Sequence, residues 1–423
     1  MHVVSADEAV TAIESGCQVF VQGGAATPSV LLDALCARAP QLSGVRVVHL
    51  HCEGPAPHLA PAMAGHLRHV ALFVGANARA AVEEGRADYV PVFLSDVPAL
   101  FRGGSLPIDV ALINVSPPDA HGFCSLGTSV DVTLAAVRSA RCVIAQINRA
   151  MPRVLGDAFV HTSEIGLAVQ VEAAPMAVAQ APPTEVERRI GGFVAELVPD
   201  GATLQLGIGA VPAAVAAALS HKRDLGIHSE MFTDAVVDLV EQGVVTGARK
   251  ELDAGRIVAA FVIGSPRLYR YIDDNPLVSL RPVDYTNDPG RIRRFRRMVA
   301  VNSAVEIDLT GQVCADSIGD HVLSGVGGQI DFLRGAAMAE EGRAIIAMPS
   351  TARGGTVSRI VPRLRPGAGV VTTRAHVHTV VTEHGVAQLH GRSLSERARA
   401  LVAIADPRHR DELMSFAKTV HRV

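Results

Sequence analysis

The sequence predicts an α/β protein in which a mainly parallel sheet carries helices on its faces. Two observations support this fold class. Short apolar runs alternate with helix-like stretches along the chain, and one strand–glycine–proline–helix pattern occurs twice. The 423 residues exceed one ordinary core and suit two domains of about 200 residues each. A hydrophobic content of 48% fits a compact protein rather than a disordered one.

The expected strands of the first half are short, buried apolar runs. They are residues 17–22, 45–50, 70–74, 110–115 and 142–147. Residues 29–39 follow the first run and have the composition of a helix. Parallel strands need such crossover helices, because the chain must return to the same edge of the sheet before the next strand begins.

The repeated pattern predicts two domains of the same fold. Residues 19–28 and 203–212 each predict a strand, a glycine turn and a proline ahead of an alanine-rich helix. Chance similarity of two strand-to-helix turns is the alternative. The equivalent positions are Gly23 with Gly207 and Pro28 with Pro212.

A domain boundary is expected between the two copies. Pro182 and Pro183 disfavour regular structure around them and precede a charged stretch. We therefore expect an N-terminal α/β domain over residues 1–183 and a C-terminal α/β domain over residues 184–423.

Charge and composition exclude several classes of protein. The net charge is −3 and no basic stripe with interleaved aromatics occurs, so no nucleic-acid partner is expected. The one dense basic run predicts either a solvated helix face or contact with an anionic ligand or a partner subunit. That run consists of Arg291, Arg293, Arg294, Arg296 and Arg297.

No membrane segment is expected. Residues 201–220 carry no charge and approach the length of a membrane span, but Gly207, Gly209 and Pro212 interrupt them, which favours a strand, a turn and a helix start. The first eight residues lack a basic start and an apolar core, so no signal peptide is expected. The scattered cysteines need no disulfide framework and fit a reducing cytoplasm. They are Cys17, Cys36, Cys52, Cys124, Cys142 and Cys314.

The second glycine turn is a possible ligand site. Gly207 and Gly209 let the backbone approach a ligand closely, and Pro212 suits the first position of the following helix. The free N–H groups at that helix start attract phosphate. An ordinary tight turn is the alternative, because the dinucleotide and phosphate-loop patterns are incomplete.

Glu230 is the candidate catalytic acid. It follows a short strand that ends near His228 and precedes an amphipathic helix with Gly243 as its expected stop. Ligands of open α/β sheets bind at the carboxyl ends of strands, which is where this carboxylate falls. An acid that merely stabilises the start of the helix is the alternative.

Two further glycine-rich segments could bind anions. Residues 324–332 contain three glycines in four residues, which suits an oxyanion hole or an anion nest. Arg353 stands beside two glycines and could bind a phosphate. Surface turns are the alternative for both. The histidines, including His376, His378 and His384 near Glu383, are poorly spaced for a metal, so no metal site is expected.

Taken together, these segments resemble the acetyl-CoA hydrolase/transferase family, a group of class I CoA-transferases that includes 4-hydroxybutyrate CoA-transferases. The matching motifs run through nearly the whole chain. They are PPDAHG (117–122), GIGAVP (207–212), HSEMF (228–232), DYTNDP (284–289), DLTGQV (308–313), GVGGQIDF (325–332) and TEHGVA (382–387).

The resemblance implies two similar domains of the NagB/RpiA-like type, with the catalytic glutamate and the CoA site in the C-terminal one. It implies that Glu230 is the catalytic glutamate and that Asn287 and the Gly328 backbone are oxyanion contacts. It further implies a CoA site formed by Gly207, Ile208, Gly209, Ala210, Val211, Val305, Gly328 and Arg353.

The activity implied is transfer of CoA between short acyl-CoA molecules and free carboxylic acids, such as 4-hydroxybutyrate, acetate or butyrate, through a glutamyl-CoA thioester. A glutamate of ordinary pKa, about 4.3, would already be ionised at neutral pH. An acyl-CoA hydrolase on the same site and a non-catalytic ligand-binding module are the alternatives. Coenzyme A enters as substrate, no metal is expected, and a cytoplasmic homodimer is the expected state.

Overall fold

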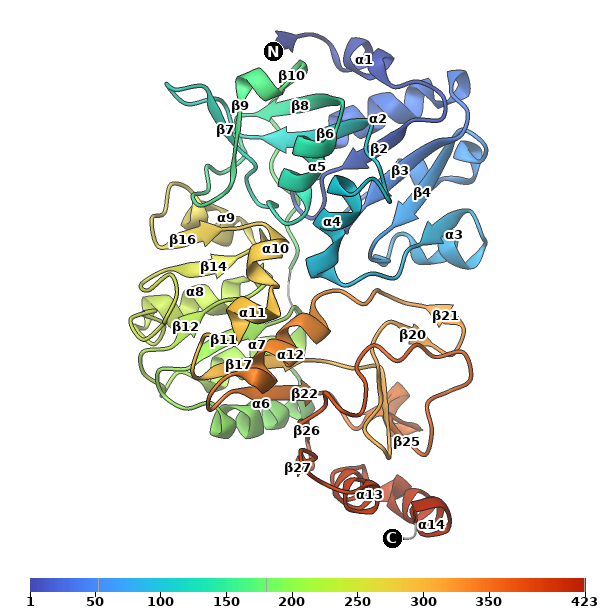
Figure 1. The fold of residues 1–423 in the computed structure, drawn as a ribbon, viewed down its shortest axis with the longest axis vertical. Coiled ribbons are helices and arrows are strands. Elements are labelled where there is room, and N and C mark those ends of the chain that lie inside the picture. Colours follow the sequence, from blue (N-terminus) through green and yellow to red (C-terminus); the bar gives the residue numbers. More distant parts are fainter. Residues whose placement is uncertain (52, 180, 422) are drawn as a thin grey trace. The chain divides into compact units, whose positions relative to one another are not determined.

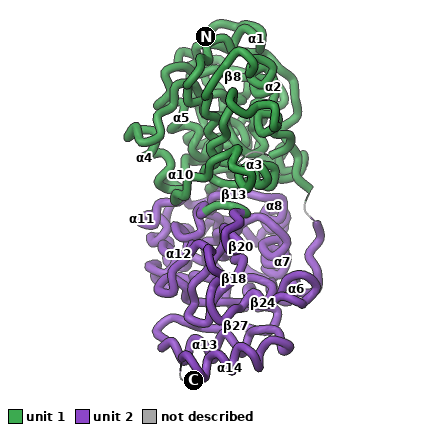
Figure 2. Tube along the Cα trace, turned by 90° about the vertical axis from the view of Figure 1, so that its right-hand side faces the viewer, with its two compact units in different colours: residues 1–179, 258–286, 323–325 green, residues 180–257, 287–322, 326–423 purple. Residues whose placement is uncertain are grey.

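The chain forms two compact units in a computed structural model that describes residues 1–51, 53–179, 181–421 and 423 (Figure 2). Unit 1 contains residues 1–179, 258–286 and 323–325. Unit 2 contains residues 180–257, 287–322 and 326–423. These units are groups of residues that pack together and are not continuous in sequence. The predicted domain boundary between residues 183 and 184 therefore stays a prediction. Cys52 lies outside the described residues.

Unit 1 is built on an eight-stranded sheet in which every neighbouring pair is parallel (Figure 1). The strand order is β1 (His2–Val3), β10 (Leu167–Val171), β8 (Cys142–Asn148), β6 (Val110–Val115), β2 (Gln18–Val21), β3 (Val45–His49), β4 (Leu67–Ala71) and β5 (Ala87–Tyr89). Four of the five expected strands match closely. The fifth, expected at 70–74, begins at Leu67 and ends at Ala71.

The helices of unit 1 include α1 (Ala6–Ala9), α2 (Ser29–Arg38), α3 (Arg79–Glu83), α4 (Val97–Arg102) and α5 (Thr133–Ser139). Helix α2 matches the helix expected at 29–39. Its buried face, with Leu31, Leu32 and Leu35, packs into the same apolar cluster as Val19 and Val21 of β2. The predicted α/β class is therefore confirmed for this unit.

Unit 2 contains a six-stranded sheet in the order β12 (Gly226–Ile227), β11 (Thr203–Leu206), β17 (Met298–Asn302), β22 (Arg343–Ala347), β26 (Thr379–Thr382) and β27 (Gly385–Gln388). The first five strands are parallel, and β27 is antiparallel to β26. This is again a mainly parallel sheet, and β12 is one of its edge strands.

Helices flank this second sheet. They include α6 (Glu185–Leu197), α7 (Ala210–Ala218), α8 (Asp234–Glu241), α11 (Pro289–Ile292), α12 (Gln329–Met338), α13 (Leu394–Ala403) and α14 (Arg410–His421). Helix α12 packs against β17 and β22, and α6 packs against α7. Gly191 permits the latter contact, because a Cβ there would stand 2.6 Å from the Ala214 carbonyl oxygen.

Both units use the repeated strand–glycine–helix pattern, through β2 with α2 and through β11 with α7. Gly209 caps α7 with φ of 115°, a conformation that favours glycine. Pro212 is the third residue of α7 rather than the first, since the helix already begins at Ala210. Proline is tolerated there because N–H groups of the first helical turn have no intrahelical partner.

The uncharged run 201–220 folds as strand, turn and helix, as expected. Across residues 1–51, 53–179, 181–421 and 423, no helix combines the length and the apolarity that crossing a membrane requires.

The register of the second sheet brings four strand ends to one edge. Thr203 of β11 pairs with Gly226 and with Met298, and Val299 of β17 pairs with Arg343. Because these strands are parallel, the segments that follow β12, β11, β17 and β22 all leave the sheet at its carboxyl edge. Ligands of open α/β sheets bind at such an edge.

Candidate active site

Glu230 lies three residues beyond the end of β12, in a segment that is bonded to β11. The His228 N–H donates to the Leu204 carbonyl at 3.0 Å, and the Ser229 hydroxyl donates to the Leu206 carbonyl at 3.1 Å. Both residues are fully buried. The backbone that leads into Glu230 is therefore fixed at the carboxyl edge of the sheet.

The Glu230 carboxylate accepts a hydrogen bond from Asn287. Asn287 Nδ2 donates to Glu230 Oε2 at 3.1 Å and also lies 3.4 Å from Asp331 Oδ2. Asn287 is fully buried and Asp331 is 4% exposed, while Glu230 is half-buried. One amide group thus connects two carboxylates in a largely dry environment.

Burial raises the pKa of Glu230, and the hydrogen bond from Asn287 opposes that rise. The pKa of Glu230 therefore lies above the ordinary value that was expected from the sequence. The physical reason is desolvation, which favours the neutral acid and which the sequence alone does not reveal.

Gly328 approaches the same carboxylate through its backbone. It caps the N-terminus of α12, and a Cβ at this position would overlap with both Glu230 Oε2 and Asn287 Nδ2. Only glycine fits between these groups. The structure therefore brings the three predicted catalytic residues, Glu230, Asn287 and Gly328, into one place.

The residues predicted to bind CoA follow neighbouring strands. Residues 207–209 join β11 to α7, whose first two residues are Ala210 and Val211, and Ile208 in the turn is 43% exposed. Val305 follows β17, where its N–H donates to the Cys314 carbonyl at 2.8 Å. These segments leave the carboxyl edge, as Glu230 does. Their role in binding CoA stays a prediction.

Arg353 follows β22 in a short 3-10 turn over Arg353–Gly355. Its side chain is exposed, and its φ of 49° lies in the left-handed region, which is unusual for a residue with a side chain. Residues with such backbone angles are frequent at ligand sites, which is consistent with the predicted role of Arg353 in binding.

Two polar anchors of unit 2 were not predicted. The Glu383 carboxylate accepts hydrogen bonds from the Ser350 N–H at 2.9 Å and from the Ser350 hydroxyl at 2.6 Å, just ahead of the Arg353 turn. Lys250 is buried beside β12. The sequence gives each residue type but not its partner, which lies 33 residues away for Glu383.

In the described part of the chain, no group of three or more His, Cys, Asp or Glu side chains could hold a metal ion. The Glu383 carboxylate accepts hydrogen bonds from Ser350, and its Oε1 also lies 3.6 Å from His384 Nε2.

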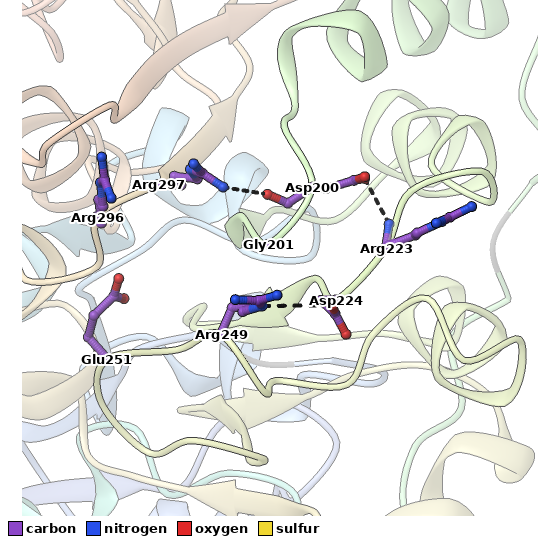
Figure 3. Close-up of a pocket in the computed structure, with 8 residues that line it drawn as sticks. All are labelled: Asp200, Gly201, Arg223, Asp224, Arg249, Glu251, Arg296 and Arg297. Atoms are coloured by element: carbon purple, nitrogen blue, oxygen red, sulfur yellow. Dashed lines mark hydrogen bonds and ion pairs between the residues drawn. The ribbon is translucent and has the colours of Figure 1, made fainter.

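Arg296 and Arg297, the last two arginines of the basic run, line a pocket of about 440 Å³ near the amino ends of β11 and β17 (Figure 3). The lining consists of Asp200, Gly201, Arg223, Asp224, Arg249, Glu251, Arg296 and Arg297. Arg296 and Arg297 pair with Glu341 at 2.6 and 2.8 Å. Carboxylates thus compensate Arg296 and Arg297, while Arg293 and Arg294 are exposed as a solvated face requires. Contact of this run with an anionic ligand or a partner subunit stays a prediction.

Comparison with known proteins identifies the family. The model of the acetyl-CoA hydrolase/transferase N-terminal domain matches residues 1–180, and that of the C-terminal domain matches residues 264–417. Glu230 lies between the two matched ranges.

Curated relatives extend over nearly the whole chain. It is 48% identical to the succinyl-CoA:acetate/propanoyl-CoA:succinate CoA transferase of Fasciola hepatica, over 97% of this chain and 86% of that protein. It is also 48% identical to the 4-hydroxybutyrate coenzyme A transferase of Clostridium kluyveri, over 98% of this chain and 97% of that protein.

A solved structure supports the same assignment. RipA of Yersinia pestis matches with a TM-score of 0.94 and 38% identity, covering 100% of this chain and 98% of that one. With family models matched at both ends and relatives aligned along its length, this chain belongs to the acetyl-CoA hydrolase/transferase family.

Proposed function

We propose that this chain is a CoA-transferase that moves CoA from a short acyl-CoA to a free carboxylate through a glutamyl-CoA thioester on Glu230. The observation that carries the proposal is the Glu230 carboxylate beside the Asn287 amide and the Gly328 backbone. Relatives that are named CoA transferases support the reaction class. Coenzyme A is then a substrate, and no metal takes part in any step.

The first half-reaction places CoA on the enzyme. Ionised Glu230 attacks the thioester carbonyl, and the tetrahedral intermediate expels CoA thiolate to leave an acyl-glutamyl anhydride. The thiolate then attacks the glutamyl carbonyl, forming the Glu230–CoA thioester and releasing the first acid as its carboxylate. The second acid reverses both steps and leaves as acyl-CoA.

The surroundings of Glu230 suit these steps. A carboxylate is a weak nucleophile in water, so partial burial and a fixed backbone favour attack. Each tetrahedral intermediate carries an oxyanion that needs donors already in place, and loss of one donor typically costs about 10²- to 10³-fold in rate. The Asn287 amide and the Gly328 N–H are the donors we assign. Residues 207–211, which form the turn after β11 and the start of α7, are assigned to the CoA nucleotide together with Val305 and Arg353.

The decisive experiment traps the covalent intermediate. Incubation with acyl-CoA followed by borohydride should modify Glu230 in the wild-type protein, and initial rates should show the parallel double-reciprocal lines of a ping-pong reaction. The Glu230→Ala variant should lose both labelling and transfer. Equal labelling of that variant, or intersecting lines, would remove the glutamyl-CoA mechanism.

An acyl-CoA hydrolase on the same site is the second candidate, because the name of the family covers both activities. Water would then replace the second acid in the attack on the glutamyl thioester. CoA release with and without acetate separates the two, since a transferase makes acetyl-CoA from another acyl-CoA and a hydrolase does not. A non-catalytic binding module would give neither product.

The acid pair, the compartment and the assembly are further parts of the proposal. We expect acetate, propionate, butyrate, succinate or 4-hydroxybutyrate among the acids, in a cytoplasmic homodimer. A panel of acyl-CoA donors against carboxylates identifies the pair. Light scattering after size exclusion measures the assembly, and a monomeric mass would contradict the dimer.

A further inference from the structure

Lys250 is a buried lysine in a chain that has three lysines, Lys222, Lys250 and Lys418. Its side chain belongs to a residue only 5% exposed to solvent. Burying an ammonium group is costly unless hydrogen bonds compensate the lost water. The contacts of this side chain therefore indicate what it does.

The Lys250 ammonium binds two backbone carbonyls. Its Nζ donates to the Ile227 carbonyl at 2.8 Å and to the Arg256 carbonyl at 2.7 Å. It also lies 5.8 Å from the centre of the Phe295 ring. Ile227 is the last residue of β12, three positions ahead of Glu230.

The geometry of the edge strand explains the first of these bonds. The N–H groups of Gly226 and His228 face β11, where they donate to Ala202 and Leu204. Because successive residues of a strand point their N–H and C=O groups to opposite sides, the Ile227 carbonyl faces away from β11. On that side the backbone of residues 244–247 bonds to Leu225, and Lys250 supplies the donor for the Ile227 carbonyl.

Gly226 makes room for this contact. A Cβ at Gly226 would lie 2.5 Å from Lys250 Cγ and 2.8 Å from Cδ. The lysine stem therefore lies directly against the strand backbone, and an alanine at this position would displace it.

We propose that Lys250 is a positioning residue that fixes the end of β12 and, through it, the Glu230 carboxylate. The inference rests on the proposed role of Glu230. Lys250 takes no part in the chemical steps, and its contribution is the placement of the segment from His228 to Glu230. A misplacement of about 1 Å at a reacting group can cost about 10²-fold in rate.

The first test compares Lys250→Met with the matched control Lys418→Met, which alters an exposed lysine of α14. Lys250→Met should lower kcat by about 10- to 100-fold while KM for acyl-CoA changes by less than about threefold. Hydrogen exchange should become faster in peptides covering residues 226–231. The control should match the wild type in both measurements.

The second test is a double-mutant cycle with Gly226→Ala and Lys250→Ala. Gly226→Ala should lower kcat when Lys250 is present and add little when the lysine stem is gone, because the two changes break the same contact. Independent, additive effects would show that Gly226 does not act through Lys250.

The outcomes separate this inference from the proposed function. Full kcat and unchanged exchange in folded Lys250→Met would overturn the positioning role. Absence of transfer and of labelling in the wild type would instead reject the proposed function. Hydrogen exchange at residues 226–231 in Lys250→Met would still test whether Lys250 fixes the end of β12. If Lys250→Met does not fold, Gly226→Ala alone decides, since it keeps the lysine and only moves its stem.

Discussion

Deprotonation of Lys250 should make the free energy of unfolding rise with pH between pH 7 and pH 9. Burial lowers the pKa of Lys250 from 10.5 to about 7, and the nearby Asp253 carboxylate partly opposes this. Between these two pH values the unfolded chain binds a proton that the folded chain does not. Stability therefore rises with pH through this window, and the penalty reaches its full size well below pH 7, where the folded chain is also protonated.

The size of the effect follows from the two pKa values. A group that binds one proton more in the unfolded state changes the free energy of unfolding by about 1.4 kcal/mol per pH unit. Lys250 is half deprotonated at pH 7, so its contribution between pH 7 and pH 9 is about 2 kcal/mol. The lost bonds to Ile227 and Arg256 cost the variant a further amount that does not vary with pH.

Urea unfolding of the wild type and Lys250→Met at pH 7, 8 and 9 measures this slope. Other titrating groups largely cancel in the difference between the two proteins, so the wild type should gain about 2 kcal/mol relative to the variant across the range. Lys222→Met serves as the control and should run parallel to the wild type. A constant difference between wild type and Lys250→Met would refute the buried titration.

Three further outcomes are expected. Gly328→Ala should lose about 10²-fold or more in kcat, because its Cβ would displace the Glu230 carboxylate, while Gly192→Ala, which has open space in α6, should keep the wild-type rate; a normal rate in Gly328→Ala contradicts the site. Asn287→Ala should lose about 10²- to 10³-fold in rate. It should also move the acidic limb of kcat/KM to higher pH, because burial then raises the Glu230 pKa unopposed; an unmoved limb argues against Glu230. Burial lowers the pKa of His58 to about 3 and of His69 to about 4, so stability should be fully present above pH 6.5 and fall as acid is added below it. His58→Leu should weaken this fall in urea midpoints between pH 7 and pH 5, and equal slopes would disprove it.

Much of the fold follows from apolar runs that stand alone between helices. The run at 110–115 is strand β6 with the expected bounds, and all six of its residues are buried. The run at 70–74 misplaces β4, because the strand begins at Leu67 and includes the polar residues Arg68 and His69. His69 is buried through contact with His58, at 3.0 Å between ring nitrogens, and a hydropathy pattern cannot show that pairing.

The candidate site was less accessible to such reasoning, because its groups come from distant parts of the sequence. Glu230 and Asn287 are 57 residues apart, and Asn287 and Asp331 are 44 apart. Family motifs named Glu230, Asn287 and Gly328 but gave no account of Asp331 or Lys250. Only in the folded chain does Asp331 lie beside Asn287 and Lys250 beside the Ile227 carbonyl, which is 23 residues earlier.

The amide of Asn287 links the electrostatics of the site to the proposed chemistry. Before reaction its donor stabilises the Glu230 carboxylate and so offsets part of the cost of burial. Once Glu230 has bonded to the thioester carbon, its oxygen is no longer an anion and accepts hydrogen bonds more weakly. The negative charge then resides on the former carbonyl oxygen. We expect the Asn287 amide, which is fixed between Glu230 and Asp331, to donate to that oxygen without a change of position. A donor that is already in place stabilises a transition state more than a ground state when the charge moves toward it during the reaction.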